Sequence, residues 1–378
     1  MVVIGAGVAG CAAALHLARR GHRVVVLERG GFPREKVCGE GLMPHGVAEL
    51  RALGITVSGR PFPGIAWHHG DAVARGDFPA GAGLGVRRYH LDALLASALA
   101  EEPGVTLHTG VRAGAIQRRA GEVVVQTDQG EVRARALVGA DGRGSRVRRH
   151  LGLEAPASAR PRYGIRAHYR LSEPPPDRVE VHVGPEAELY LTPTGAREIN
   201  VAVLCGRETT RALRGGLTEG FERLVRGRLP LLEGAERLTA PAVAGPLRQA
   251  VRSTVADRAV LVGDAAGFVD AITGEGMALS LLGARLAAEL LDEGLRTDRL
   301  SAHDLAPHDR RWRRRVRDPA RMAEVILWGL RRPRLAKRVV RNLARHPELF
   351  GRLLAVQAGQ APLTSLRLGG LRRLLVGA

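Results

Sequence analysis

Cysteine, lysine and aromatic residues are all scarce in this chain of 378 residues. Its three cysteines, Cys11, Cys38 and Cys205, are too few and too scattered for a disulfide framework or a cysteine-rich zinc site, so we expect a reducing, cytoplasmic setting. No stretch reaches the roughly 18 apolar residues that a membrane span needs. No basic region with a cleavage site precedes the first apolar run, so we expect no signal peptide. With only 13 aromatic residues and no recognisable module for it, we expect no nucleic-acid partner.

Arginine is abundant where lysine is missing. Lys36 and Lys337 are the only lysines among 57 basic residues, and the formal net charge is +19. Residues 305–378 hold 18 basic and four acidic side chains, which leaves a net charge of only +5 for the rest. Basic and apolar residues alternate there at roughly helical spacing, so we predict a basic C-terminal helical segment. Two interpretations stay open: a helical cap with a solvated basic face, or peripheral attachment to an anionic membrane.

The first thirty residues predict a strand, a glycine-rich turn, a helix and a second strand. Residues 1–4 and 23–27 are short β-branched runs, and residues 11–20 are rich in alanine and leucine. The first strand begins at Met1, with almost nothing before it. The turn between strand and helix reads Gly-x-Gly-x-x-Gly, which in this setting indicates a dinucleotide site.

Each glycine of this turn has a physical task. Gly5 permits the tight turn, Gly7 lets the backbone approach a pyrophosphate, and Gly10 lets the helix pack close to the sheet. The phosphates then lie at the helix N-terminus, where free N–H groups favour anions. Glu28 ends the second strand, 18 residues after Gly10, and can accept hydrogen bonds from a ribose diol, with Arg29 beside it.

Two later motifs favour FAD over NAD. Residues 136–146 contain Gly-Ala-Asp141-Gly, and residues 259–277 contain Gly263-Asp264 followed by Gly274, Gly276 and Met277. Each motif is an apolar strand that ends in a Gly/Asp turn and opens a helix. A second aspartate at such a turn suits a flavin, because the ribityl hydroxyls need an acceptor.

This order of motifs resembles the flavoprotein superfamily of para-hydroxybenzoate hydroxylase, geranylgeranyl reductases and flavin-dependent halogenases, over roughly residues 1–300. The resemblance implies an α/β fold with a Rossmann-type FAD-binding domain, an inserted β-sheet substrate domain and a C-terminal helical segment. We predict the FAD-binding domain at residues 1–60, 86–155 and 240–304, the substrate domain at 61–85 and 156–239, and the helical segment at 305–378.

The resemblance also implies roles for single residues. Asp264 would accept hydrogen bonds from the ribityl chain, and backbone N–H groups of residues 274–277 would face the flavin pyrimidine ring. Arg88, in a segment like the family's Arg-x-x-Leu element, would contact the flavin side of FAD, and Val111 would meet the adenine. Asp141 would stabilise the turn beside the cofactor and help to hold a nicotinamide donor. Each of two residues also has a structural interpretation without a cofactor contact. Asp141 could only stabilise a turn, and Arg88 could be a solvated arginine at the start of a helix.

Residues 33–39 read Pro-Arg-Glu-Lys-Val-Cys-Gly and resemble the Pro-x-x-Lys-x-Cys-Gly element of the geranylgeranyl reductase-like branch. Arg34 and Lys36 can pair with the FAD pyrophosphate, and Gly39 allows close backbone approach to a ring. Cys38 would face the pocket. It is either a proton donor or redox group, or a small apolar filler beside the flavin.

Residues 163–171, 179–183, 188–192 and 199–204 predict strands that roof the substrate pocket. Trp67, Tyr190 and Pro193 are the candidate pocket residues. The reductases carry a Tyr-x-Trp-x-x-Pro type of element here and the halogenases a Trp-x-Trp element, whereas this chain has Tyr190-Leu-Thr-Pro193. His68 and His69 lack ligand partners at metal-binding spacing, so we expect no metal.

We therefore predict an FAD-dependent oxidoreductase that acts on a small hydrophobic substrate. The favoured form is an NAD(P)H-dependent monooxygenase that hydroxylates an aromatic or polyketide-like substrate with molecular oxygen through a flavin hydroperoxide. One alternative is a geranylgeranyl reductase-like enzyme that saturates isoprenoid or lipid double bonds. An alternative of another class is a non-catalytic flavin-binding or lipid-associated protein.

Overall fold

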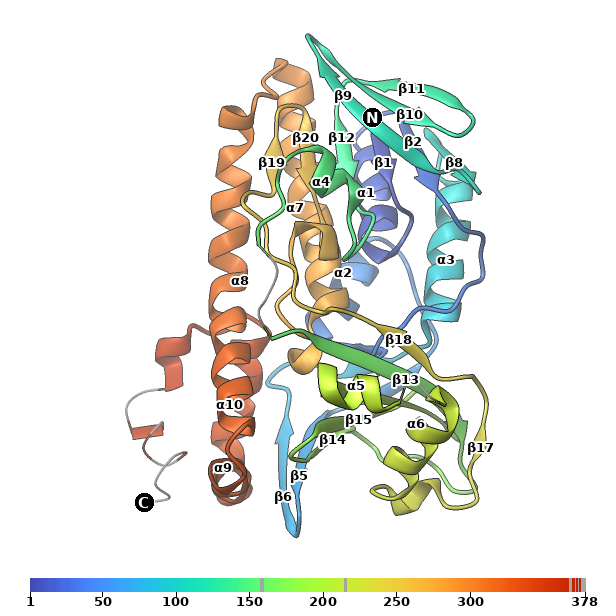
Figure 1. Ribbon diagram of the computed structural model, residues 1–378. Coiled ribbons are helices and arrows are strands. Elements are labelled where there is room, and N and C mark those ends of the chain that lie inside the picture. Colours follow the sequence, from blue (N-terminus) through green and yellow to red (C-terminus); the bar gives the residue numbers. More distant parts are fainter. Residues whose placement is uncertain (157–159, 214–215, 367–368, 371, 373, 375–378) are drawn as a thin grey trace.

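The computed structural model describes residues 1–156, 160–213, 216–366, 369, 370, 372 and 374 (Figure 1). Its first layer is a six-stranded sheet with the order β19-β20-β12-β1-β2-β8. The strands are β1 Val2–Ile4, β2 Val24–Glu28, β8 Val105–Thr109, β12 Leu137–Gly139, β19 Val255–Ala256 and β20 Ala259–Leu261. Five of them run parallel, from β20 through β12, β1 and β2 to β8, so their carboxyl ends meet at one edge of the sheet.

Helices cover one face of this sheet and a β-meander covers the other. The helical face carries α1 Val8–Ala18, α3 Arg88–Glu101 and α7 Gly276–Thr297, and α1 is buried along its whole length. The opposite face packs on β9 Ala113–Arg119, β10 Glu122–Thr127 and β11 Gly130–Ala134, with α4 Arg146–His150 beside them. The predicted strand–turn–helix–strand unit is confirmed. The first helix begins three residues earlier than expected, because Gly10 already has helical geometry.

A second, eight-stranded sheet forms the lower part of the molecule in Figure 1. Its order is β17-β13-β16-β15-β14-β5-β6, and β18 pairs with β13. The bounds are β5 Gly64–His69, β6 Ala72–Asp77, β13 Arg162–Arg170, β14 Val179–Val183, β15 Ala187–Pro193, β16 Glu198–Gly206, β17 Glu236–Arg237 and β18 Ala242–Ala244. The four predicted strands of this region are confirmed as β13 to β16.

Cross-strand register decides which residues share a face of this sheet. Arg166 pairs with Ala202, Ala202 with Tyr190, Tyr190 with Val181 and Val181 with Trp67, so all five lie on one face. Neighbouring rows on the other face include Ile165 and Leu189, which pack under α6 Leu217–Arg226. A small sheet of β3 Gly41–Leu42, β7 Gly83–Gly85 and β4 Arg60–Phe62 lies beside α2 Pro44–Ala52, while α5 Arg207–Ala212 follows β16.

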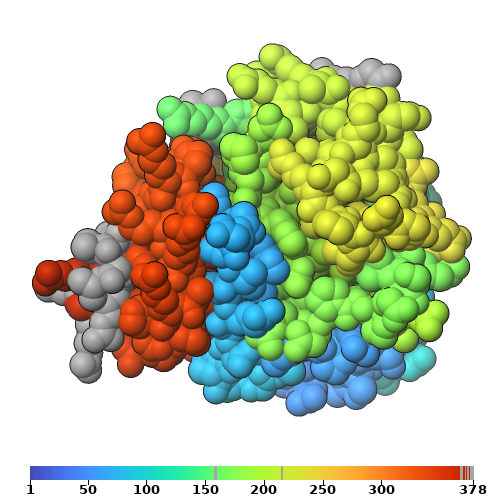
Figure 2. Space-filling model, turned by 90° about the horizontal axis from the view of Figure 1, so that it is seen from below, coloured from blue at the N-terminus to red at the C-terminus, as the bar shows by residue number. Residues whose placement is uncertain are grey.

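The described part of the predicted C-terminal segment is largely helical, and residues 367, 368, 371, 373 and 375–378 lie outside the described residues. Helix α8 Ala302–Leu330 runs beside α7, and α9 Pro333–Arg345 and α10 Pro347–Gln357 return onto the hairpin of β5 and β6 (Figure 1). Figure 2 shows this segment in orange and red against the blue strands of residues 60–80. Met322, Val340 and Phe350 belong to one apolar cluster with Ile65 and Val181 of the second sheet. The fold class predicted from the sequence is therefore confirmed. In the part of the chain that the structure describes, no helix is both long and apolar enough to cross a membrane.

Candidate cofactor site

Five loops gather at the carboxyl edge of the parallel sheet. They follow β1, β2, β8, β12 and β20. Glu28 is the last residue of β2, and the loops after the other four strands carry Gly5, Val111, Asp141 and Asp264 respectively. Ligands of open α/β sheets bind at this edge. Residues that are as far as 259 positions apart in the sequence therefore border one site.

The glycine turn has the geometry that a pyrophosphate requires. Gly5 adopts a φ of +99°, and a Cβ on it would lie 2.5 Å from the carbonyl oxygen of Ala140. A Cβ on Gly10 would lie 1.8 Å from the carbonyl oxygen of Gly5, whereas a Cβ on Gly7 would meet nothing within 4 Å. Gly7 is the N-cap of α1 and provides no side-chain cap, so the first N–H groups of the helix are left for a ligand.

Glu28 is buried and ionised beside this turn. Its carboxylate accepts hydrogen bonds from the backbone N–H groups of Ala6 (2.8 Å) and Gly30 (3.0 Å) and pairs with Arg34 Nη1 at 2.7 Å. Burial alone would raise the pKa of Glu28, but the ion pair with Arg34 and the two backbone donors bring it below its usual value. Arg34 also donates to the carbonyl of Ala6 at 2.9 Å, while Arg29 is exposed.

Asp264 provides the sharpest test of whether the site fits FAD. Its half-buried carboxylate accepts no hydrogen bond from any residue that the structure describes, and it lines a cavity of about 160 Å³ together with Gly263, Gly267 and Ser280. Burial raises the pKa of Asp264, and Arg143 and Arg88 oppose this rise. A buried acceptor without a donor is costly unless a ligand provides one. The hydroxyls of a ribityl chain are suitable donors, so the residues present fit FAD.

Helix α7 points its N-terminus at the same cavity. Gly274 takes the left-handed conformation with a φ of +68°, and the helix begins at Gly276 without a side-chain cap. Gly276 and Glu275 line the cavity, Met277 is buried behind them, and His45 Nε2 lies 2.9 Å from Glu275 Oε2. Uncapped N–H groups at the end of a 22-residue helix favour negative charge at this point.

Asp141 and Arg88 are both held by protein partners. Asp141 accepts hydrogen bonds from Ser145 Oγ and from the N–H groups of Arg146 and Val147, so it stabilises the turn into α4. Arg88 is half-buried and forms a bidentate pair with Asp92, with distances of 2.7 and 3.0 Å. Arg88 is therefore not a solvated helix-start arginine.

Val111 is buried just after β8. Its N–H donates to the carbonyl of Glu28 at 3.0 Å, which leaves its own carbonyl for any contact with an adenine. The predicted contact with the adenine is therefore possible only through the Val111 carbonyl oxygen, as a hydrogen-bond acceptor.

The loop that carries Cys38 is tied to the second sheet by buried polar residues that the sequence analysis missed. Glu40 is fully buried and lies 2.6 Å from His168 Nε2, while Asn200 donates to Glu40 (3.1 Å) and to the carbonyl of Cys38 (2.8 Å). Arg166 donates to the carbonyl of Lys36 at 3.0 Å. One signal was visible: Arg166 and His168 are basic residues two positions apart on β13, and Ile165 and Ala167 alternate with them.

This anchoring fixes the surroundings of three predicted residues. Burial raises the pKa of the Cys38 thiol, although nearby Arg88 opposes the rise, and burial lowers the pKa of Lys36. Gly39 is exposed, and a Cβ on it would meet nothing within 4 Å, so its backbone is accessible.

None of the three predicted pocket residues borders the 160 Å³ cavity, and only Trp67 and Tyr190 share a face of the second sheet. The hydroxyl of Tyr190 is buried and has no hydrogen-bond partner among the described residues, and burial raises its pKa. Trp67 packs edge-on against Phe350 with ring centroids 5.7 Å apart, and Pro193 is buried beside Gly85. Their contact with a substrate stays a prediction.

His68 lacks ligand partners along the sequence, but β5 pairs with β14, and this pairing brings Glu180 and His182 beside it. The expectation that the chain binds no metal stays a prediction. Sequence spacing missed the cluster because its members come from two strands that are more than a hundred residues apart.

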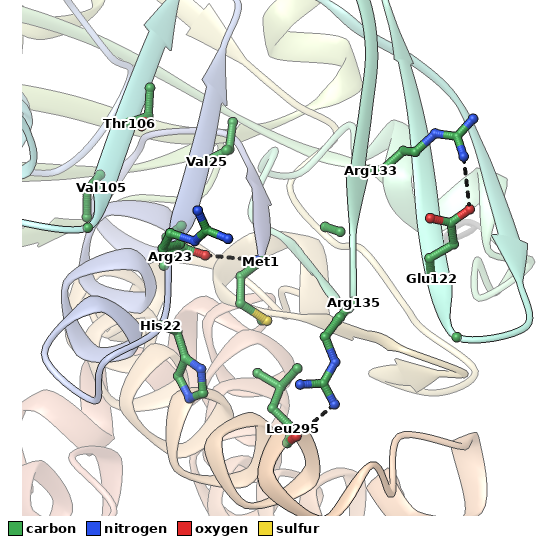
Figure 3. Close-up of a pocket in the computed structure, with 14 residues that line it drawn as sticks. Met1, His22, Arg23, Val25, Val105, Thr106, Glu122, Arg133, Arg135 and Leu295 are labelled. Carbon is green, nitrogen blue, oxygen red and sulfur yellow. Dashed lines mark hydrogen bonds and ion pairs between the residues drawn. The ribbon is translucent and has the colours of Figure 1, made fainter.

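A second hollow, of about 770 Å³, lies at the opposite edge of the parallel sheet (Figure 3). Its lining includes Met1, Arg23, Val105 and Arg135, at the amino ends of the strands. The glycine turn, the uncapped helix ends and Asp264 all lie at the other edge, so the cofactor site is not in this hollow.

Comparisons with known proteins agree with this geometry. A family model described as an FAD binding domain matches residues 1–316. Menaquinone reductase of Mycobacterium tuberculosis (strain ATCC 25618 / H37Rv) is 33% identical, over 77% of this chain and 76% of that protein. Digeranylgeranylglycerophospholipid reductase 1 of Methanopyrus kandleri is 30% identical, over 86% of this chain and 89% of that protein. A flavoprotein/dehydrogenase from Cytophaga hutchinsonii has the same fold, with a TM-score of 0.82, 20% identity and coverage of 99% and 96%.

Proposed function

Because the chain belongs to the FAD-binding domain family and is an FAD-dependent oxidoreductase, we propose that it reduces carbon–carbon double bonds of an isoprenoid lipid. The observation that carries the proposal is the Cys38 loop. It resembles the loop of the geranylgeranyl reductase-like branch, and Glu40, His168 and Asn200 hold it between the cofactor edge and the second sheet. The two relatives reported above are both named as reductases, and each is matched over more than three quarters of its length.

Reduction of a double bond adds a hydride to one carbon and a proton to the other. FAD, when bound and reduced, supplies the hydride. We assign the proton to the Cys38 thiol. Burial raises its pKa, so it keeps its proton at neutral pH. Its sulfur is held in place, since the N–H of Glu40 donates to Cys38 Sγ at 3.4 Å.

NAD(P)H is the proposed source of electrons. Glu28, with its buried carboxylate, is already assigned to the FAD ribose, so the nicotinamide donor has no dedicated dinucleotide turn in this proposal. It would approach the oxidised flavin only for the hydride transfer and then leave, which a comparison of NADH, NADPH and dithionite as reductants tests.

The test uses anaerobic, FAD-loaded protein with NADH, NADPH or dithionite as the reductant and menaquinone or digeranylgeranylglycerophospholipid as the substrate. After re-oxidation in air, which returns any quinol to quinone, mass spectrometry should show a product that keeps two added hydrogen atoms for each reduced double bond. Cys38→Ala should lower the rate of this gain by about 100-fold, which is the low end for loss of a general acid, while the FAD content stays unchanged. Cys205→Ala is the matched control, because Cys205 is buried in the second sheet under α6. Full turnover by Cys38→Ala would remove the thiol from the mechanism.

Hydroxylation is the second candidate, and one feature favours it. The reductase-like element ends in Tyr190-Leu-Thr-Pro193, without the tryptophan of the reductase pattern. In an aerobic arm, a hydroxylase consumes oxygen only when phenolic substrate and NAD(P)H are both present, and the product gains one oxygen atom. Oxygen incorporation together with no anaerobic hydrogen gain would replace the reductase proposal with this one.

A further inference from the structure

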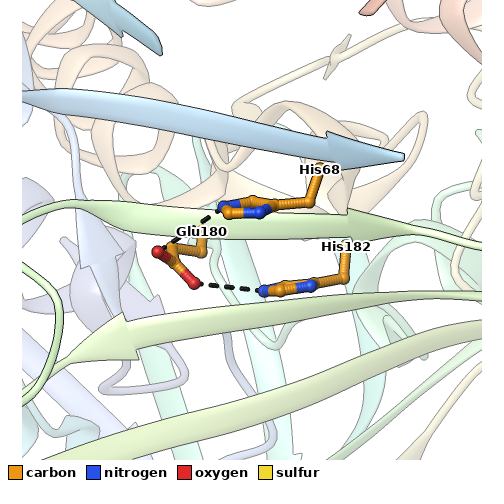
Figure 4. A group of neighbouring side chains, drawn as sticks. All are labelled: His68, Glu180 and His182. Carbon is orange, nitrogen blue, oxygen red and sulfur yellow. Dashed lines mark hydrogen bonds and ion pairs between the residues drawn. The ribbon is translucent and has the colours of Figure 1, made fainter. Parts of the chain in front are cut away.

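His68, Glu180 and His182 form a compact cluster on the second sheet (Figure 4). Strand β14 pairs in parallel with β5, and this register sets His182 directly beside His68. Glu180 is two residues before His182, so its side chain emerges on the same face. His68 Nε2 lies 3.5 Å from Glu180 Oε1, and His182 Nε2 lies 3.1 Å from Glu180 Oε2.

This cluster is separate from the cofactor site. The row of His68 and His182 continues through Leu189 into the apolar face that packs under α6. Trp67 and Val181 alternate with these residues and point to the opposite face, toward the C-terminal helices. The three side chains of the cluster are 20%, 19% and 26% exposed, so an ion can reach them from solvent.

We propose that His68, Glu180 and His182 bind a divalent transition-metal ion, with zinc as the first candidate. Two imidazole nitrogens and one carboxylate oxygen are a donor set that zinc prefers in proteins. One potential ligand atom from each residue lies within 4.8 Å of the other two. Modest side-chain rotations would bring all three to the roughly 2.0–2.2 Å that zinc ligands require.

Two features of the side chains point to an ion at their centre. The imidazole rings of His68 and His182 are stacked, with centroids 4.3 Å apart and planes within 10°, so both present Nε2 to the same carboxylate. Nε2 of His68 is buried and makes no hydrogen bond with a described residue, although it lies at an ion-pair distance of 3.5 Å from Glu180 Oε1. A metal ion would use this nitrogen as a ligand.

The site would join two distant parts of the chain. The hairpin of β5 and β6 meets the rest of the second sheet along β14, and the C-terminal helices α9 and α10 pack on β6. An ion bound between β5 and β14 would cross-link this hairpin to the rest of the sheet. Bound metal should therefore raise the melting temperature of the protein as well as occupy the site.

The experiment measures metal content and affinity, so its outcome does not depend on the proposed activity. FAD-loaded protein without a histidine tag is stripped with EDTA, dialysed and titrated with ZnCl₂ by calorimetry, and its zinc content is measured after gel filtration. We expect one zinc ion per chain and a melting temperature that is a few degrees higher. His68→Ala, His182→Ala and Glu180→Gln should each weaken binding by at least about 10-fold. His303→Ala is the matched control, because His303 is exposed on the first turn of α8.

Two results would overturn the proposal. One is a wild-type protein that retains no stoichiometric zinc, cobalt, nickel or ferrous ion, which would leave the cluster as an ion pair with two histidines. The other is that all three variants retain as much zinc as the wild type, which would show that the ion binds at another site. Unchanged FAD content and circular dichroism in the variants would show that any loss of metal is not a loss of fold.

Discussion

We expect the side chain of Asp264 to lower the stability of the apoprotein and to strengthen FAD binding. Its carboxylate is half-buried at the 160 Å³ cavity and receives no donor from the residues that the structure describes. Such a group destabilises the protein without cofactor and is stabilised when ligand hydroxyls reach it. The two effects have opposite signs, so a substitution can separate them.

Asp264→Ala should therefore weaken FAD binding without weakening the apoprotein. Loss of hydrogen bonds to a charged acceptor costs about 1.5–3 kcal/mol, which corresponds to a roughly 10- to 150-fold lower affinity. The melting temperature of the apoprotein should be equal to or above that of wild-type apoprotein, because a half-buried carboxylate without a protein donor is gone. The ratio of flavin to protein absorbance and a thermal melt of both apoproteins measure these quantities. Asp264→Asn keeps an acceptor oxygen, so its FAD affinity should lie between that of the wild type and that of Asp264→Ala. A fully yellow alanine variant would contradict the assignment.

Helices α1 and α8 each bury a histidine, His16 and His308 respectively. Burial lowers the pKa of His16 and of His308 from 6.5 to about 4. In the unfolded chain each histidine gains a proton near its ordinary pKa, whereas the folded protein resists protonation until about pH 4. Between these values the unfolded state binds more protons, so the free energy of unfolding falls as the pH falls from 6.5 to 4.

His308→Leu should flatten this acid dependence. A single titrating group contributes a slope of up to about 1.4 kcal/mol per pH unit inside its window. Urea unfolding at several pH values between 4 and 7 measures the slope, which should decrease by about that amount in the variant. His303→Leu, at an exposed position one turn earlier on the same helix, should leave the slope unchanged. An identical slope in the wild type and in His308→Leu would show that His308 does not resist protonation.

Strands and helices with strong local sequence patterns could be predicted from the sequence. The pairing of strands that are distant in the sequence could not. The β1–α1–β2 unit follows from a β-branched run, a glycine turn and an alanine-rich helix, so its candidate cofactor residues Gly5, Gly7 and Glu28 were identifiable. The strand β14 was visible from alternation. Its pairing with β5 depends on contacts between distant segments, so the cluster at His68 was not foreseeable. The Glu40–His168 pair was hidden for the same reason.

The charge of the whole molecule is concentrated on the C-terminal helices. Helix α9 turns Val340 and Leu343 inward against the second sheet, so its apolar face is already covered. What remains exposed is a basic surface, of which Lys337 and Arg341 share Asp71 as a partner. At the end of α8, Trp328 and Val325 are 52% and 60% exposed. An arginine-rich surface beside an exposed tryptophan matches the headgroup region of an anionic bilayer.

Attachment of this surface to a membrane should be electrostatic and therefore sensitive to salt. The protein should co-sediment with vesicles that contain anionic phospholipid, but not with neutral vesicles, and should detach as the salt rises toward 1 M, where the Debye length is about 3 Å. Trp328→Ala should weaken binding, because the indole side chain, on which Arg332 stacks at 3.9 Å, is lost from the contact. Val243→Ala is the control, since Val243 is 41% exposed on β18 in the second sheet. If wild-type protein stays in the supernatant with anionic vesicles even at low salt, the basic helices serve only as a cap, and the proposed lipid substrate would have to reach the protein without membrane attachment.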